Sequence, residues 1–161
     1  MLTERHDGSR DFDFLLGHWH VHNRQLRHRL QGSDEWREFD ATQSVQLILG
    51  GLGNLDEMET ELQGTRFIGL SLRLYNPETR LWSIYWVDNR SAELQPPVVG
   101  SFRDGVGLFS GADICNGQPV IARFIWSEIT DNSARWEQAF SPDAGQTWET
   151  NWIMTFQRRP A

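Results

Sequence analysis

Alternation between large apolar and polar side chains constrains the fold of this chain more than any other feature of its sequence. Because a strand points successive side chains to opposite faces, a period of two predicts a half-buried strand. The last such run carries these residues on one face: Trp148, Thr150, Trp152, Met154, Phe156 and Arg158. Its opposite face is polar except for Ile153. Similar rows surround Trp126, Trp136 and the pair Trp82 and Trp86.

Short turns separate these runs. Asp104-Gly105 and Asn116-Gly117 are pairs that tolerate positive φ and favour type I′ hairpins, and Asp131-Asn132 marks a third turn. Runs and turns together predict ten strands, over residues 18–28, 37–49, 54–62, 66–75, 81–89, 97–102, 106–112, 119–129, 134–140 and 148–158. Only residues 10–16 have helical character.

Many strands joined by short turns predict an all-β fold, a single antiparallel up-and-down β-barrel of about ten strands with a short N-terminal helix. Closing the sheet into a barrel removes its unpaired edges, and a two-sheet sandwich is the alternative. No shift in composition divides the chain. We therefore expect one domain over residues 1–161, with residues 1–10 flexible.

The charge and the choice of basic residues exclude several function classes. The net charge is −7, so nucleic acid and anionic membranes are not expected as partners. All fifteen basic residues are arginine, which excludes a Schiff-base lysine and a phosphate-loop lysine. The only cysteine, Cys115, is expected to be a structural thiol. The polar start of the chain has no signal-peptide pattern and no segment is long enough to cross a bilayer, so we expect a cytoplasmic protein.

A hairpin motif lies at residues 141–148. Ser141, Asp143, Gly145, Thr147 and Trp148 follow the Ser-x-Asp-x-Gly-x-Thr-Trp pattern of the Asp-box turn in sialidase propellers. That turn is structural, and a single copy does not predict a propeller.

Three histidines alternate with two apolar residues at the start of the first predicted strand. His18, His20 and His22 share one face, and Trp19 and Val21 share the other. If the histidine face points inward, the row is a candidate metal site. If Trp19 points inward, the histidines lie on the outer wall, which is the phase we expect.

Gly17-His18-Trp19 after a short helix, followed by a meander and a terminal basic residue, resembles the calycin superfamily of lipocalins and fatty-acid-binding proteins. The chain is also similar over its whole length to an uncharacterised bacterial family of calycin-like domains. The resemblance implies that Trp19 closes one barrel end and that Arg158, or its neighbour Arg159, packs over it. Some calycin relatives similar to nitrobindin bind haem through a late histidine. Every histidine here lies at or before His28, so no cofactor is expected.

Further candidate ligand contacts lie on other strands. Glu57 belongs to an acidic run that could supply a carboxylate inside the barrel. Arg73 and Tyr75 resemble the carboxylate-binding pair of fatty-acid-binding proteins, although Ile68, Leu70, Leu72 and Leu74 compete for the inner face. That apolar count favours a solvated Arg73.

These observations predict a barrel that binds a small apolar or aromatic molecule in a cavity lined by tryptophan. The expected contacts are Trp86, Asp88, Trp126, Trp136, Trp152, Arg73, Tyr75 and Glu57. The alternatives are an enzyme acting on such a molecule through His18, His20 and His22 or through barrel carboxylates, and a barrel filled by its own rings. Apolar residues on both faces of two strands predict a homodimer.

Overall fold

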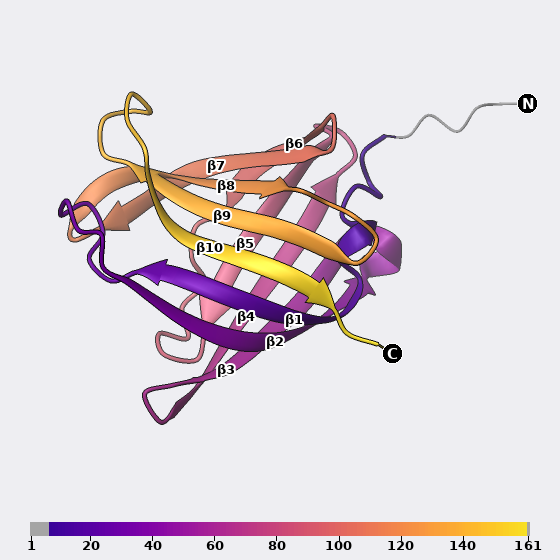
Figure 1. Cartoon of the computed structure of the whole chain (residues 1–161). Helices are drawn as coiled ribbons and strands as arrows, with labels where there is room; N and C mark the ends of the chain where they lie inside the picture. The colour runs from indigo at the N-terminus through magenta and orange to yellow at the C-terminus, as the bar shows by residue number, and fades with distance from the viewer. Residues whose placement is uncertain (1–6, 161) are drawn as a thin grey trace, which may run out of the picture.

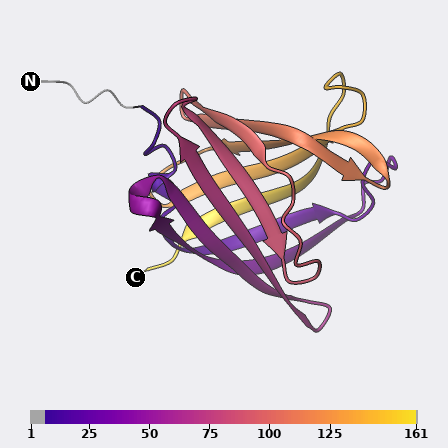
Figure 2. The same ribbon diagram turned by 180° about the vertical axis from the view of Figure 1, so that it is seen from behind.

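Ten strands follow one another along the chain, each hydrogen-bonded to the next, and the tenth pairs with the first (Figures 1 and 2). The computed structural model describes residues 7–160. The strands are β1 (Gly17–Leu26), β2 (Trp36–Ile48), β3 (Gly53–Leu62), β4 (Thr65–Asn76), β5 (Leu81–Asp88), β6 (Val98–Arg103), β7 (Val106–Cys115), β8 (Gln118–Ser127), β9 (Ser133–Ser141) and β10 (Glu149–Arg158). The expected all-β, closed antiparallel barrel is confirmed.

The turns follow from residues that tolerate positive φ. Asp104 and Gly105 have φ of 52° and 78°, and Asn116 and Gly117 have φ of 52° and 76°. Two successive positive φ values are those of the type I′ turn, whose twist matches that of paired strands. The predicted hairpins β6–β7 and β7–β8 are therefore present.

The expected N-terminal helix is only a 3₁₀ turn, η1 (Asp13–Leu15). No side chain caps its first turn, and seven residues are too few to pay the cost of nucleating an α-helix. The turn instead places the fully buried Phe12 and Leu15 across one end of the barrel. A second 3₁₀ turn, η2 (Leu49–Gly51), joins β2 to β3. Within residues 7–160, no helix is long and apolar enough to cross a membrane.

Trp19 and Arg158 close the same end of the barrel. The indole of Trp19 is fully buried and donates to the Leu15 carbonyl at 2.7 Å. The Arg158 guanidinium lies 4.2 Å from the Trp19 ring centroid, and donates to the carbonyls of Phe14 and Leu16. A cation–π contact of this kind contributes about 0.5–2 kcal/mol. This is the contact that the resemblance implied.

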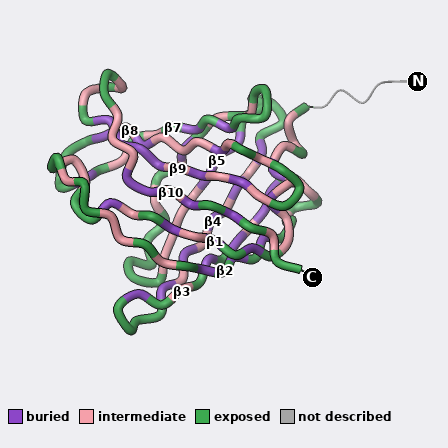
Figure 3. The backbone as a smooth tube through the Cα atoms, in the orientation of Figure 1, coloured by how far each residue is buried: buried purple, intermediate pink, exposed green. Residues whose placement is uncertain are grey.

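Buried and exposed residues alternate along each strand, which shows which side chains point into the barrel and which point outward (Figure 3). On β1, Trp19, Val21 and Asn23 are buried, whereas His18 and His20 are exposed. On β4 the expected phase was wrong, because Arg73 is 3% exposed and the leucines face outward. Arg73 shares its face with two buried aromatic residues of the same strand and is neutralised by a buried aspartate, so this face is stable inside the barrel.

The N-terminal residues that the structure describes contact the barrel. The Asp7 carbonyl accepts a hydrogen bond from the Tyr75 hydroxyl, and the Gly8 carbonyl accepts one from the Trp82 indole at 3.0 Å. Residues 1–6, to which the expectation of flexibility also applies, lie outside the described residues.

Candidate ligand-binding cavity

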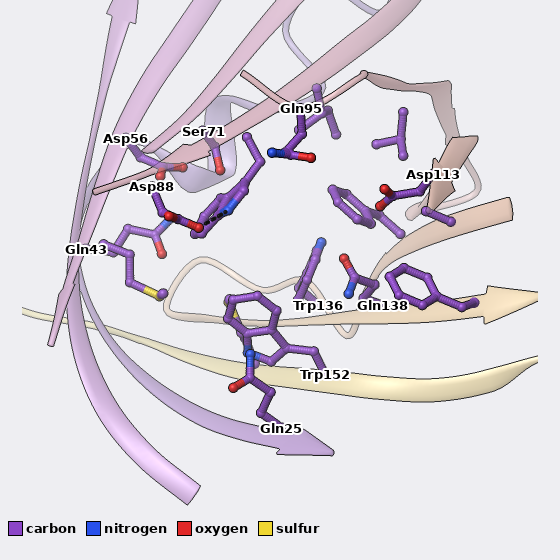
Figure 4. A pocket seen from close by; sticks show the side chains of 18 of the residues that line it. Gln25, Gln43, Asp56, Ser71, Asp88, Gln95, Asp113, Trp136, Gln138 and Trp152 are labelled. Carbon is purple, nitrogen blue, oxygen red and sulfur yellow. Dashed lines mark hydrogen bonds between the residues drawn. The ribbon is translucent and has the colours of Figure 1, made fainter. Parts of the chain in front are cut away.

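A cavity of about 310 Å³ occupies the barrel on the inner side of the Phe12 plug (Figure 4). Side chains of all ten strands line it, together with residues of the loops 27–35 and 89–97. Ligand pockets begin at about 300 Å³, so this cavity is large enough for one compact molecule. The structure therefore contradicts the alternative of a barrel whose interior is filled by its own aromatic rings.

Five aromatic rings form a continuous belt around the cavity. Phe67 stacks on Trp86 at 6.4 Å between ring centroids, and Trp86 meets Trp152 edge to face at 5.9 Å. Trp152 in turn meets Trp136 at 5.5 Å, and Trp136 meets Phe124 at 4.9 Å, both edge to face. Each ring is held by its neighbours in a favourable geometry, so the belt is rigid before any ligand enters.

Two of these indoles differ in how their N–H groups are used. Trp152 donates to the Asn23 side-chain oxygen at 3.0 Å. The Trp136 indole nitrogen points into the cavity (Figure 4) and makes no hydrogen bond within residues 7–160. This N–H is therefore open to the cavity and can donate a hydrogen bond to a ligand acceptor.

Trp86 lies flat over Gly69 of β4. A Cβ at position 69 would come within 2.0 Å of the Trp86 ring, so only glycine leaves room for it. The Trp86 indole nitrogen donates to Asp88 Oδ2 at 3.3 Å, the dashed line in Figure 4. Gly69 and Asp88 together fix the orientation of this ring.

The inner end of the cavity carries a buried ion pair. Arg73 Nη1 donates to Asp56 Oδ2 at 2.5 Å and to Asn54 Oδ1 at 2.9 Å. Burial raises the pKa of the Asp56 carboxyl, and the Arg73 guanidinium opposes that shift. Asp56 Oδ1 and Arg73 Nε make no hydrogen bond within the described chain. Both atoms are themselves buried, so the ion pair is part of the cavity wall and does not present them to a ligand.

The cavity brings together most of the residues that the sequence singled out. Trp86, Asp88, Trp126, Trp136, Trp152 and Arg73 line it, as do Gln43 and Gln138. Tyr75 is buried at the closed end, where it packs against Trp82 at 5.3 Å, and it does not line the cavity. Glu57 lies exposed on the outer wall, and its neighbour Asp56 takes the inner place.

Trp148 was expected on the same face as Trp152, but the structure places it on another face. The pairing of β10 with β9 shifts between Thr150 and Trp152, so residues before this bulge no longer share the face of Trp152. Trp148 packs outside, with the Arg123 guanidinium 4.1 Å from its ring centroid. Asn151 is buried at the bulge and accepts from Gln138 at 2.8 Å.

The histidine row lies on the outer wall opposite β2. His18 is 2.8 Å from the Ser44 hydroxyl, and His22 lies 2.9 Å from Asp40 and 3.0 Å from Glu38. These two carboxylates raise the pKa of His22, with the hydrogen bond to Glu38 the larger cause. Among residues 7–160, no group of three ligand-type side chains is placed to hold a metal ion. The histidines do not reach the cavity.

Cys115 is buried near the rim, where burial raises the pKa of its thiol. A raised pKa disfavours the reactive thiolate. This agrees with the expectation of a structural thiol.

Comparison of the sequence with protein-family models and with curated proteins finds no match. A solved structure shares the fold: the S-type phycobiliprotein lyase CpeS from Guillardia theta has a TM-score of 0.62 and 11% sequence identity. The similarity covers 100% of this chain and 99% of that one. The chain therefore shares the closed antiparallel barrel fold of that structure over its full length.

Proposed function

We propose that this barrel binds a small, largely apolar or aromatic molecule between Trp86, Trp136 and Trp152, without covalent chemistry and without a required metal. The observation that carries the proposal is the aromatic belt around a cavity of about 310 Å³, with one indole N–H directed into it. Apolar walls with a few polar groups that orient the ligand are typical of small-molecule sites. The likeness to a lyase of the same architecture supports the barrel and does not identify the ligand.

Acid–base catalysis on such a molecule is the second candidate function. It would depend on Asp56, whose carboxyl has a raised pKa and lies at the cavity floor. We rank it below binding because Asp56 already pairs with Arg73, and because Ser71, the only hydroxyl residue among the described residues that line the cavity, makes no side-chain hydrogen bond to a base.

The binding proposal is tested with N-phenyl-1-naphthylamine, a neutral aromatic probe whose emission rises in apolar surroundings. We expect saturable binding with Kd around micromolar, because a compact ligand with few polar anchors gains affinity mainly from burial. Tryptophan emission should fall as the probe fills the belt. Treatment with EDTA should leave both signals unchanged.

A matched pair of variants on β4 locates the probe. Ser71→Phe places a ring in the cavity, because Ser71 is buried and lines it. Leu72→Phe adds a ring one residue later, on the outer wall. We expect Ser71→Phe to abolish binding and Leu72→Phe to leave it unchanged. Equal binding by both variants, or no saturable binding by the parent protein, would contradict the proposal.

A further inference from the structure

Three arginines stand at the rim of the cavity, although the chain as a whole is acidic. Arg29 lies on the loop between β1 and β2, Arg37 is the second residue of β2, and Arg90 follows β5. All three line the cavity. None belongs to an ion pair within residues 7–160. This group, the rim arginines, differs from Arg73, whose charge is neutralised at the floor.

Aromatic rings hold the rim arginines in place. The guanidinium of Arg29 lies 5.4 Å from the Phe140 ring centroid, and that of Arg90 lies 5.2 Å from Phe67. Arg37 lies 5.9 Å from the ring of the adjacent Phe39. A guanidinium held over a ring keeps N–H groups in its plane that can still donate, so these cations are oriented without being neutralised.

Carboxylates at the same rim are engaged elsewhere. Asp88 Oδ1 accepts from the backbone N–H groups of residues 90 and 91, and Asp113 Oδ1 accepts from that of residue 114. Glu149 Oε1 accepts from the backbone N–H of residue 30 at 2.6 Å. These acids lower the local positive potential, but their hydrogen bonds fix loops and strand ends. They do not form contact ion pairs with the rim arginines.

The rim arginines also repel one another. Burial and the nearby charges of Arg90 and Arg27 lower the pKa of Arg37, and burial with the charge of Arg37 lowers that of Arg29. A second hollow, outside the cavity, shares Gln25, Arg29 and Arg37 with it. Gln25 Oε1 accepts from both Nε and Nη2 of Arg37, at 2.8 Å from Nε, which holds this guanidinium between the two hollows and leaves Nη1 to meet an anion. An anion placed at this threshold would relieve the repulsion.

We propose that the ligand is an amphipathic organic anion, with its aromatic body in the tryptophan belt and a single carboxylate-like group held at the threshold by Arg29 and Arg37. The inference rests on the proposed function and adds the chemical class of the ligand. A guanidinium matches a planar oxyanion with two parallel hydrogen bonds, and such charge-assisted bonds are stronger than neutral ones. The rim therefore selects against neutral molecules of the same shape.

Two probes that share one aromatic skeleton and differ by a single sulfonate group test this selection. 1-Anilinonaphthalene-8-sulfonate carries a sulfonate on the skeleton of the neutral N-phenyl-1-naphthylamine. We expect the parent protein to bind the anion at least about tenfold more tightly, the scale of charge-assisted hydrogen bonds. Added NaCl should weaken binding of the anion and leave the neutral probe unaffected, because salt screens charge at an open rim.

The variant Arg29→Gln/Arg37→Gln removes the two charges at the threshold. Binding of the anion should fall by about tenfold or more, whereas the neutral probe keeps its affinity and so reports an intact cavity. Arg103→Gln is the matched control, because Arg103 is exposed at the far end of β6 and does not line the cavity. It should change neither affinity. Ser71→Phe should abolish binding of both probes.

The outcomes separate this inference from the function on which it rests. Equal affinities of the parent protein for both probes would overturn the anion preference and leave binding intact. A double variant that loses both probes equally, or an anion affinity insensitive to salt, would also overturn it. Failure of the parent protein to bind the neutral probe would contradict the proposed function itself.

Discussion

At the scale of single residues, Gly69 controls the position of Trp86. Gly69→Ala would place a methyl group 2.0 Å from the Trp86 ring, so the ring must leave its place in the belt. We expect about a tenfold loss of affinity for N-phenyl-1-naphthylamine and a loss of stability of about 1–3 kcal/mol, as in other overpacked cores. Probe titration and urea unfolding measure the two effects. Ser71→Ala, two residues along the same face, is the control and should bind like the parent protein.

His22 gives a pH-dependent signal on the outer wall. Its pKa is raised by Glu38 and Asp40, so the folded state binds the proton more tightly than the unfolded chain does. The resulting stability is fully present below pH 6.5 and is lost as the pH rises through the folded-state pKa. NMR titration of the ring should report a pKa above 6.5 in the parent protein. Asp40→Asn should lower this value, and an unchanged titration would contradict the assigned contacts.

The inward-facing side chains of a strand could be predicted from the sequence where one face is plainly aromatic. They could not be predicted where the inner face mixes polar and apolar residues. The phase of β1 follows from Trp19 and Val21. On β3 acids and apolar residues alternate without a dominant apolar row, whereas on β4 the most apolar row lies on the outer wall, and a shift of one residue moves every side chain to the other face. Glu57 was therefore placed inside in error, and Asp56 was missed.

At the scale of elements, the β9–β10 hairpin depends on its Asp-box residues. Asp143 accepts from the Thr147 backbone at 2.8 Å and from its hydroxyl at 2.5 Å, and the Ser141 hydroxyl donates to it at 2.9 Å. Asp143→Ala leaves these donors without their acceptor, so the thermal unfolding midpoint should fall by a few degrees. Asp143→Asn keeps one acceptor oxygen and should lose less. Unchanged melting of the alanine variant, measured by circular dichroism, would show that the turn does not depend on this carboxylate.

The strands could be predicted because runs of alternating apolar and polar residues, separated by turn residues, recur along the chain. The observed strand bounds differ from the expected ones by only a few residues. The bulge before Trp152 could not, since an extra residue in a strand leaves no mark in a pattern of period two. The rim arginines come from a loop and from two strand ends. Only closure of the barrel brings Arg29, Arg37 and Arg90 to one cavity.

At the scale of the whole molecule, the outer wall of β4 is unusually apolar. Ile68, Leu70, Leu72 and Leu74 are half-buried there, while Ile121 and Ile125 lie in the same state on β8. We expect one of these faces to pack against a second copy of the chain, giving a dimer in sedimentation at tens of micromolar, roughly the range of weak association. Leu72→Glu should shift the protein to monomer if β4 is the interface, and Ile121→Glu if β8 is. Monomer at every concentration in the parent protein would exclude the dimer.

The pairing of β10 with β1 closes the barrel into a ring of ten strands, each hydrogen-bonded to two neighbours. Residue 158 lies opposite residue 19, so both ends of the described chain leave from the plugged base, whereas the rim arginines stand at the other rim. The order of strands around the ring therefore does not depend on where the polypeptide starts. A circularly permuted chain, joined across the base and opened at the exposed hairpin tip of Asp104 and Gly105, would retain every strand pair and keep its new ends away from the cavity entrance.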